Sequence, residues 1–174
     1  VAVMVAVGLE EVECLAVVDV LFRAGIGADL LSISDSLEVT SSHDIHLRCD
    51  ALASQVNLAD YALMFLPGGM PGTLNLGASA LVTDEVCRRS AAGQPLAAIC
   101  AAPSILAEHG ALQARHATAN PGFMDAIAAG GALMSEAAVV RDANLITSRG
   151  MGTATELGFE IIRVHLGDDA EQVV

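Results

Sequence analysis

The sequence contains no lysine and no tryptophan, and aromatic residues make up only 3% of its 174 positions. All eight basic residues are arginine, against 21 acidic ones, so the formal net charge is −13. Binding to nucleic acid or to an anionic membrane needs a basic surface, and we therefore expect neither as a partner. The absence of lysine also excludes catalysis through a lysine Schiff base.

Long apolar runs are missing as well. The chain is 53% hydrophobic with a mean hydropathy of +0.56, yet no apolar run reaches the roughly 18 residues that a membrane helix needs. No basic segment precedes the first apolar run, as a secretory signal would require. We expect a cytoplasmic protein whose apolar excess fills a core and a subunit interface.

Motifs for cofactors and metals are also missing. The four cysteines show no C-x-x-C spacing, which favours reduced thiols over a disulfide framework. The glycine-rich turns form neither G-x-G-x-x-G nor G-x-x-x-x-G-K-[ST], so the phosphate cradles of nucleotide-binding folds are absent. His43 and His46 offer two metal ligands at most. We expect no cofactor and no metal ion.

What the sequence does contain is an alternation of apolar runs and helical patterns. The runs predicted as buried strands are 1–7, 30–33, 61–66, 96–99, 139–140 and 145–148. The predicted helices are 10–24, 81–92, a short one after Cys100, 123–128 and 153–166, the last opened by a capping box at Thr153. This alternation predicts a single α/β domain over residues 1–174, with a mostly parallel sheet and helices on both faces.

A cysteine occupies the junction of one strand and the following helix, in the stretch "LAAICAAPS" at residues 96–104. Ligands of open α/β sheets bind beyond the carboxyl ends of the strands. A helix N-terminus favours thiolate over thiol, and a sharp strand-to-helix turn projects its side chain outwards. We therefore expect a positive φ at Cys100 and a thiol pKa well below about 8.5. A buried structural cysteine would fit the stretch equally well.

Four stretches together resemble the ThiJ/PfpI superfamily: "GLEEVECLAVVDVLFRAG", "LPGGMPGTLNL", "AAICAAPSILAEHG" and "ITSRGMGTATELGFEII". They are most similar to the branch of the Parkinson-disease protein deglycase and the bacterial YajL-type proteins. The likeness covers nearly the whole chain in order. It implies a doubly wound, flavodoxin-like sheet related to class I glutamine amidotransferases, and a homodimer.

The resemblance also implies site residues. Cys100 matches the family's reactive cysteine, and Glu13 matches the glutamate that hydrogen-bonds its sulfur. Periodicity by itself does not choose between Glu13 and Glu11, because each shares a helix face with apolar residues. Backbone N–H groups of Gly68, Gly69 and Ala101 are then expected to stabilise an oxyanion.

The chain departs from the family pattern at two positions. Asn120 stands where relatives with clear glyoxalase and deglycase activity carry a histidine, and an amide cannot move a proton near pH 7. His43 matches a position commonly held by an arginine that reaches towards the partner subunit's cysteine, so it is a candidate base supplied across a dimer. Arg149 matches a position at the pocket rim, where it steers an anion or pairs with an acid.

Two functions remain open. In the first, Cys100 attacks a small α-oxoaldehyde such as methylglyoxal, or its early adduct, in a cofactor-free glyoxalase or deglycase reaction. In the second, the protein is a redox-sensing stress protein or chaperone whose Cys100 is oxidised to sulfenate or sulfinate, with little catalysis. Retention of Cys100 and Glu13 permits the first, whereas Asn120 favours the second.

Overall fold

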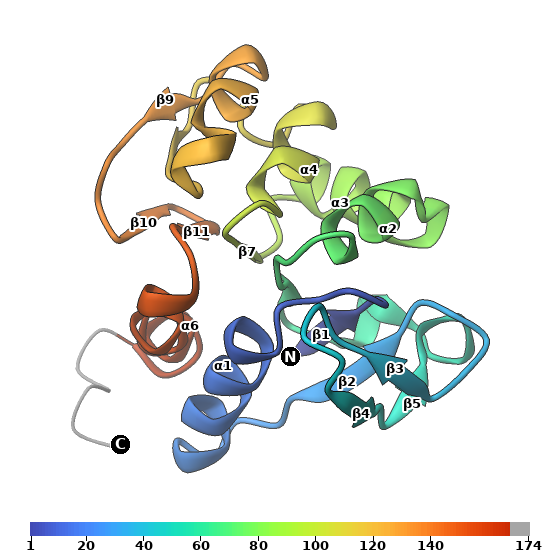
Figure 1. Ribbon diagram of the computed structural model, residues 1–174. Helices are drawn as coiled ribbons and strands as arrows, with labels where there is room; N and C mark the ends of the chain where they lie inside the picture. The colour runs from blue at the N-terminus through green and yellow to red at the C-terminus, as the bar shows by residue number, and fades with distance from the viewer. Residues whose placement is uncertain (168–174) are drawn as a thin grey trace.

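A seven-stranded sheet forms the centre of the computed structural model, which describes residues 1–167 (Figure 1). Its strand order is β10-β11-β7-β6-β1-β2-β5. The bounds are β1 Ala2–Val5, β2 Asp29–Ser32, β5 Ala51–Leu52, β6 Met64–Leu66, β7 Leu96–Ile99, β10 Val139–Asp142 and β11 Leu145–Ser148. Neighbours pair in parallel except β10 and β11, as the continuous apolar runs predict.

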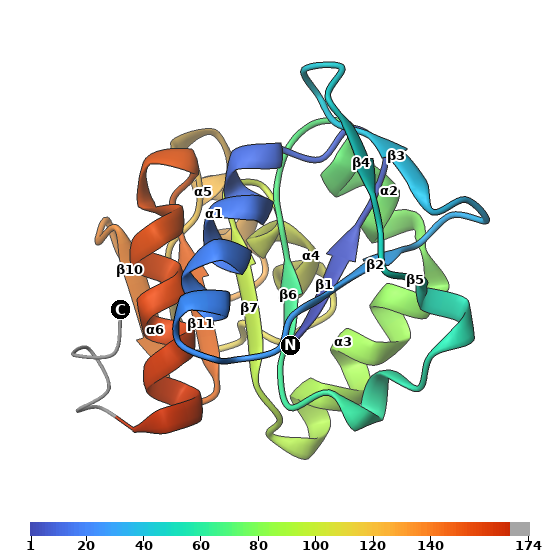
Figure 2. The same cartoon turned by 90° about the horizontal axis from the view of Figure 1, so that it is seen from below.

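Helices cover both faces of this sheet (Figures 1 and 2). One face carries α1 (Glu11–Arg23) and α6 (Ala154–Leu166); the other carries α2 (Gly72–Ala78), α3 (Ala80–Ala92), α4 (Pro103–Glu108) and α5 (Met124–Ala129). Strand β1 shows why: Met4 lies in the core beneath α2 to α5, whereas Val3 and Val5 lie beneath α1 and α6. The predicted doubly wound α/β fold is confirmed.

Smaller elements complete the fold. Antiparallel β3 (Glu38–Thr40) and β4 (His46–Arg48) form a hairpin. Helix α2 and the parallel pair of β8 (His116–Ala117) with β9 (Leu133–Met134) were not predicted, because short elements in glycine-rich or mixed sequence have little periodicity. Among the described residues, no helix has the length and apolar content needed to cross a bilayer.

The predicted capping box at Thr153 is wrong. Thr153 is the residue before α6, but its side chain caps no N–H of that helix. Its hydroxyl instead lies 2.6 Å from the Ser148 hydroxyl and accepts a hydrogen bond from the Gly150 N–H at 3.2 Å. Contacts within the loop between β11 and α6 therefore outweigh the capping preference, and the hydroxyl fixes the loop that follows β11.

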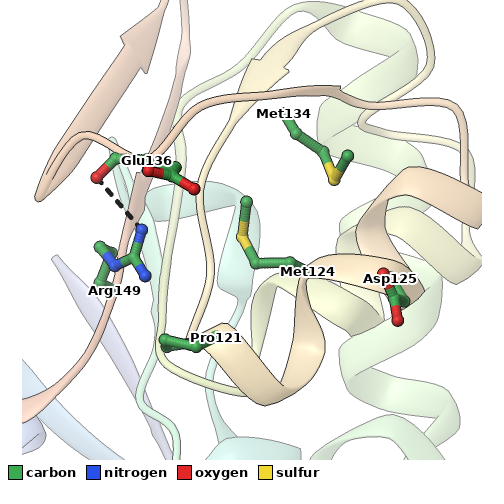
Figure 3. Close-up of a pocket in the computed structure, with 6 residues that line it drawn as sticks. All are labelled: Pro121, Met124, Asp125, Met134, Glu136 and Arg149. Atoms are coloured by element: carbon green, nitrogen blue, oxygen red, sulfur yellow. Dashed lines mark hydrogen bonds between the residues drawn. The ribbon is translucent and has the colours of Figure 1, made fainter.

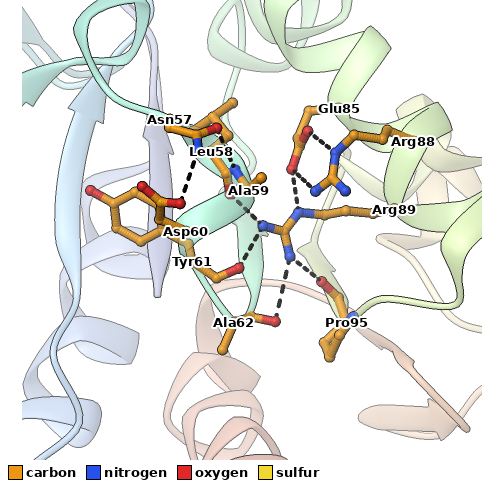
Figure 4. Close-up of polar contacts among 10 residues, drawn as sticks. All are labelled: Asn57, Leu58, Ala59, Asp60, Tyr61, Ala62, Glu85, Arg88, Arg89 and Pro95. Atoms are coloured by element: carbon orange, nitrogen blue, oxygen red, sulfur yellow. Dashed lines mark hydrogen bonds and ion pairs between the residues drawn. The ribbon is translucent and has the colours of Figure 1, made fainter.

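The buried arginine Arg89 ties α3 to the segment before β6 (Figure 4). Its side chain is fully buried and donates to the Glu85 carboxylate at 2.7 Å. It also donates to the carbonyls of Leu58 and Tyr61, both at 2.7 Å. A buried cation is tolerated when paired and hydrogen-bonded in this way, so this cluster is structural.

Candidate functional site

Cys100 lies at the carboxyl end of β7, at the centre of the sheet edge where parallel strands end. Its φ is 64°, as expected, and a non-glycine residue held there costs about 1–3 kcal/mol. The backbone is fixed on both sides, because its N–H donates to Ser148 and its carbonyl accepts from Asn120, both at 2.9 Å. The side chain is partly exposed. The conformation thus holds a partly exposed cysteine at the sheet edge.

Glu13, in the first turn of α1, is the acid that contacts this cysteine. Its carboxyl shares a hydrogen bond with the Cys100 thiol and accepts one from the Gly68 N–H at 3.0 Å. Only 1% of Glu13 is exposed. Glu11 is also buried, but it points to His43, 2.9 Å away. Tertiary structure therefore makes the choice between the two glutamates that periodicity left open.

Burial raises the pKa of Glu13 from 4.5 to about 7. Hydrogen bonds from Cys100 and Gly68 act in the opposite direction, and the negative charge of Glu10 adds to the rise. No arginine or histidine is among the groups that shift it. Near neutral pH the carboxyl therefore exchanges its proton readily, as a group that must both accept and donate protons requires.

The expectation of an acidic Cys100 is wrong. Burial, followed by the charge and hydrogen bond of Glu13, raises the pKa of the Cys100 thiol to about 12. Backbone N–H groups of Ala101 and Gly69 act against this rise. The strand-end position predicted the donors, but not the desolvation or the adjacent carboxylate. The two groups share one proton over a wide pH range and titrate as a pair.

Gly68 and Gly69, in the loop after β6, direct their backbone N–H groups to different partners. The N–H of Gly68 is directed to Glu13, so Gly68 orients the acid and is not aimed at an oxyanion. The N–H groups of Gly69 and Ala101 are directed to the sulfur. A Cβ on Gly68 would lie 2.5 Å from the Glu13 carboxylate and 2.6 Å from the Cys100 Cβ. Glycine is required there because acid and thiol close around its backbone.

Asn120 and Gly150 border the same space. The Asn120 side-chain oxygen accepts from the Gly122 N–H at 3.0 Å, which leaves its amide nitrogen as a donor. That nitrogen and the Glu13 oxygen Oε1 lie 3.8 and 3.7 Å from where a Cβ on Gly150 would be. Asn120 therefore faces the space beside the acid. Sequence analysis missed Gly150, although it stands in the quoted "RGMG".

His43 is exposed and bound to acids of its own chain. Its ring nitrogen Nδ1 lies 2.9 Å from Glu11 and 3.8 Å from Glu10. The structure places it against the start of α1 and leaves the predicted role across a dimer untested. The three side chains offer ligand atoms within 4.8 Å of one another, so the sequence-based count of two possible ligands at His43 was too low.

The other cysteines have different surroundings. Cys14 and Cys49 are buried, and burial raises the pKa of their thiols to about 12 and about 11. Cys87 is exposed and lies 3.9 Å from His109. Cys100 is the partly exposed one, and both a carboxyl and backbone donors contact it.

Comparison with known proteins gives consistent matches. The model of the DJ-1/PfpI family matches residues 1–164. Protein dj-1beta of Drosophila melanogaster is 36% identical over 99% of this chain and 92% of its own length. Glutathione-independent glyoxalase DJR-1.2 of Caenorhabditis elegans is 28% identical over 92% of this chain and 84% of its own. A solved structure, Toxoplasma gondii DJ-1, oxidized, has a TM-score of 0.91 and 33% identity, covering 99% and 94% of the two chains.

Proposed function

The chain belongs to the DJ-1/PfpI family, and on that premise we propose a cysteine-dependent, cofactor-free enzyme of the glyoxalase or deglycase type. Its substrates would be α-oxoaldehydes such as methylglyoxal, or their early adducts. One observation carries this proposal: a partly exposed thiol on a strained turn shares a hydrogen bond with a buried glutamate whose pKa is raised to about 7. A nucleophile beside a proton carrier is what carbonyl addition and isomerisation need.

The proposed reaction conserves every atom. The Cys100 thiol adds to the aldehyde carbon of methylglyoxal while the Glu13 carboxylate takes the thiol proton and passes it to the aldehyde oxygen. Glu13 then removes the hydrogen on that carbon and returns a proton to the neighbouring carbon. The hydroxyl proton of the first carbon passes to the oxygen of the second, so that the first becomes the thioester carbonyl and the second carries the hydroxyl. This leaves a lactoyl thioester on Cys100. Water hydrolyses the thioester and releases lactate, with the thiol and the acid restored.

The surrounding groups fit these steps. Donors from Gly69 and Ala101 stabilise the thiolate, and the free amide of Asn120 faces the space in which the carbonyl oxygen would lie. Asn120 donates a hydrogen bond but cannot relay a proton, so Glu13 carries the transfers. One relative is named a glutathione-independent glyoxalase, which supports the same type of activity.

The direct test is lactate formation from methylglyoxal by the purified protein. We expect the native chain to form lactate, Cys100→Ser to form none, and Cys87→Ser, a matched change at an exposed thiol, to keep full activity. No lactate from the native chain, or equal loss in both variants, would overturn the proposal.

The position of the shared proton has its own test. The raised pKa of the Cys100 thiol, about 12, predicts that thiolate absorbance stays low at neutral pH, and Glu13→Leu should move its midpoint downwards because the charge of Glu13 raises the thiol pKa. A midpoint near 7 in the native chain would instead place the proton on Glu13.

The redox-sensing function stays the alternative, favoured by the contrast among the cysteines. Cys14 and Cys49 are buried with raised pKa values, whereas Cys100 is partly exposed beside an acid that can hold a sulfinate oxygen. One similar structure is that of oxidized Toxoplasma gondii DJ-1. Mild peroxide followed by mass spectrometry should modify Cys100 before the other three. Uniform modification of all four would remove this alternative.

We also propose that the chain acts in the cytoplasm as a homodimer. Val12, Leu15 and Phe22 are exposed on α1 at 42%, 37% and 79%, an apolar set at helical spacing that a second subunit would cover. Light scattering at micromolar concentration should give twice the chain mass. Phe22→Glu should shift it towards the monomer.

A further inference from the structure

Two acids and a histidine gather at the start of α1, in a group that includes neither Cys100 nor Glu13. Its members are Glu10, Glu11 and His43, and their possible ligand atoms lie within 4.8 Å of one another. Two carboxylates and an imidazole form a donor set that divalent metal ions accept in proteins. We call these three residues the α1 cluster.

Backbone contacts hold His43 against the start of the helix. The Ser42 N–H donates to the Leu9 carbonyl at 2.8 Å, so the loop between β3 and β4 runs along the residues that precede α1. The Ser41 hydroxyl oxygen accepts a hydrogen bond from the His43 N–H at 3.3 Å, which fixes the turn. The histidine, 32 positions from Glu11 in the chain, is therefore held beside the acids by its own loop.

A buried oxygen of Glu11 has no partner. Only 8% of Glu11 is exposed. Burial alone would raise its pKa, but hydrogen bonds from its own N–H, from Ser41 and from His43 lower it, so the carboxylate is ionised. Its oxygen Oε2 is nevertheless without a hydrogen-bond partner among residues 1–167. A buried charged oxygen left in this way costs free energy, and a cation beside it would remove that cost.

The cavity drawn in Figure 3 is a weaker place for a cation. Its lining residues all lie between positions 121 and 149, and none belongs to the α1 cluster. It also contains two acids, Asp125 and Glu136, but Arg149 lies among them and none of the lining residues is a histidine. The α1 cluster, by contrast, joins its acids to an imidazole.

We propose that the α1 cluster is a Zn²⁺ site, with one ligand each from Glu10, Glu11 and His43. The imidazole favours Zn²⁺ over Mg²⁺ and Ca²⁺, which prefer oxygen ligands, and the cluster has no thiolate of the kind that selects Cu⁺. The His43 side chain is 62% exposed, so water can complete the coordination. The sequence-based expectation of no metal ion counted histidines and not the acids of α1.

The test is a titration of the metal-free protein with Zn²⁺ at neutral pH, in competition with a chromophoric chelator of micromolar affinity. We expect one ion bound per chain. Glu11→Gln and His43→Gln should each weaken binding at least about tenfold, the lower end of the loss that disturbing a metal site causes. His46→Gln and Glu38→Gln are the matched controls, because both residues are bonded within the neighbouring hairpin, and they should leave the affinity unchanged.

The histidine ligand has a readout of its own, which does not depend on the buried Glu11 variant folding correctly. In protein whose histidine rings are isotope-labelled, Zn²⁺ should shift the ring resonances of His43 and leave those of His109 and His116 in place. Cys100→Ser should bind Zn²⁺ with the affinity of the native chain, because the cluster contains no thiol.

Three results would overturn the site. The first is no bound Zn²⁺ at micromolar concentration, and the second is equal affinity in the native chain and in His43→Gln. The third is loss of binding in Cys100→Ser, which would move the ion to the reactive cysteine. None of them depends on lactate formation, so the Zn²⁺ site and the proposed function can fail separately.

Discussion

Glu13 and Glu85 are both buried acids on helices that pack against the sheet, but their neighbours differ. Glu85 is bonded to Arg88 and Arg89, each at 2.7 Å, and these bonds outweigh its burial and lower its pKa. Glu13 has a thiol and a backbone N–H instead, and burial raises its pKa to about 7. A buried acid with cations is locked in its charged form, whereas one without them can exchange a proton at neutral pH.

The same contrast sets opposite pH dependences of stability. The lowered pKa of Glu85 means that its contribution is present above its ordinary value of 4.5 and is lost as the pH falls through the folded pKa. The raised pKa of Glu13 means that its contribution is present below 4.5 and is lost as the pH rises through about 7. Above pH 7 the reactive pair therefore works against folding.

The largest effect is expected from breaking the structural cluster. Arg89→Met should lower the free energy of unfolding by about 3–5 kcal/mol, because buried Glu85 and the carbonyls of Leu58 and Tyr61 lose their partner. Urea denaturation measures this change, and the folded fraction should keep its Cys100 alkylation rate. Arg88→Met, at a more exposed side chain, should cost below about 1 kcal/mol. Equal losses in the two variants would contradict the distinction.

The second-largest effect is a pH-dependent loss of stability caused by ionisation of Glu13. Glu13→Gln cannot ionise, so the native chain should lose about 1–3 kcal/mol of stability relative to this variant between pH 4.5 and 8. Denaturation curves at several pH values measure the difference. Parallel stability profiles for the two proteins would show that Glu13 has an ordinary pKa.

Adding a second proton carrier beside Glu13 should raise the rate of lactate formation. Asn120 faces the space beside Glu13, so Asn120→His should raise the rate of lactate formation about tenfold above the pKa of the new imidazole, at the low end of general acid–base effects. Asn57→His, at an exposed residue before β6, serves as control. An unchanged rate would mean that Glu13 already carries every transfer.

The smallest effect concerns the room above Gly150. A Cβ there meets Glu13 and Asn120 at ordinary contact distances of 3.7 and 3.8 Å, so Gly150→Ala should change stability by less than about 1 kcal/mol. It should nevertheless slow alkylation of Cys100 by a bulky maleimide several-fold. Gly152→Ala, where a Cβ would meet nothing within 4 Å, should leave that rate unchanged.

Some features of the fold and the site could be predicted from the sequence, and others could not. The alternation of apolar runs predicts the parallel sheet, and the sharp strand-to-helix turn at Cys100 predicts its positive φ. These features depend on neighbours a few positions away. Helix α2 was missed because a short glycine-rich segment has little periodicity, and the role of Thr153 because its hydroxyl bonds to the preceding loop and not to its own helix.

The sequence by itself determined the layers of the fold and the placement of one cysteine at a strand end, because backbone periodicity and turn sterics are local. Tertiary structure decided that Glu13 and not Glu11 meets that cysteine and that His43 pairs with Glu11. It also decided that no arginine or histidine of residues 1–167 shifts the pKa of the reactive acid. The physical reason is that desolvation and charge act through space. Glu13 and Gly68 are 55 positions apart in the chain, and only folding brings them within a hydrogen bond.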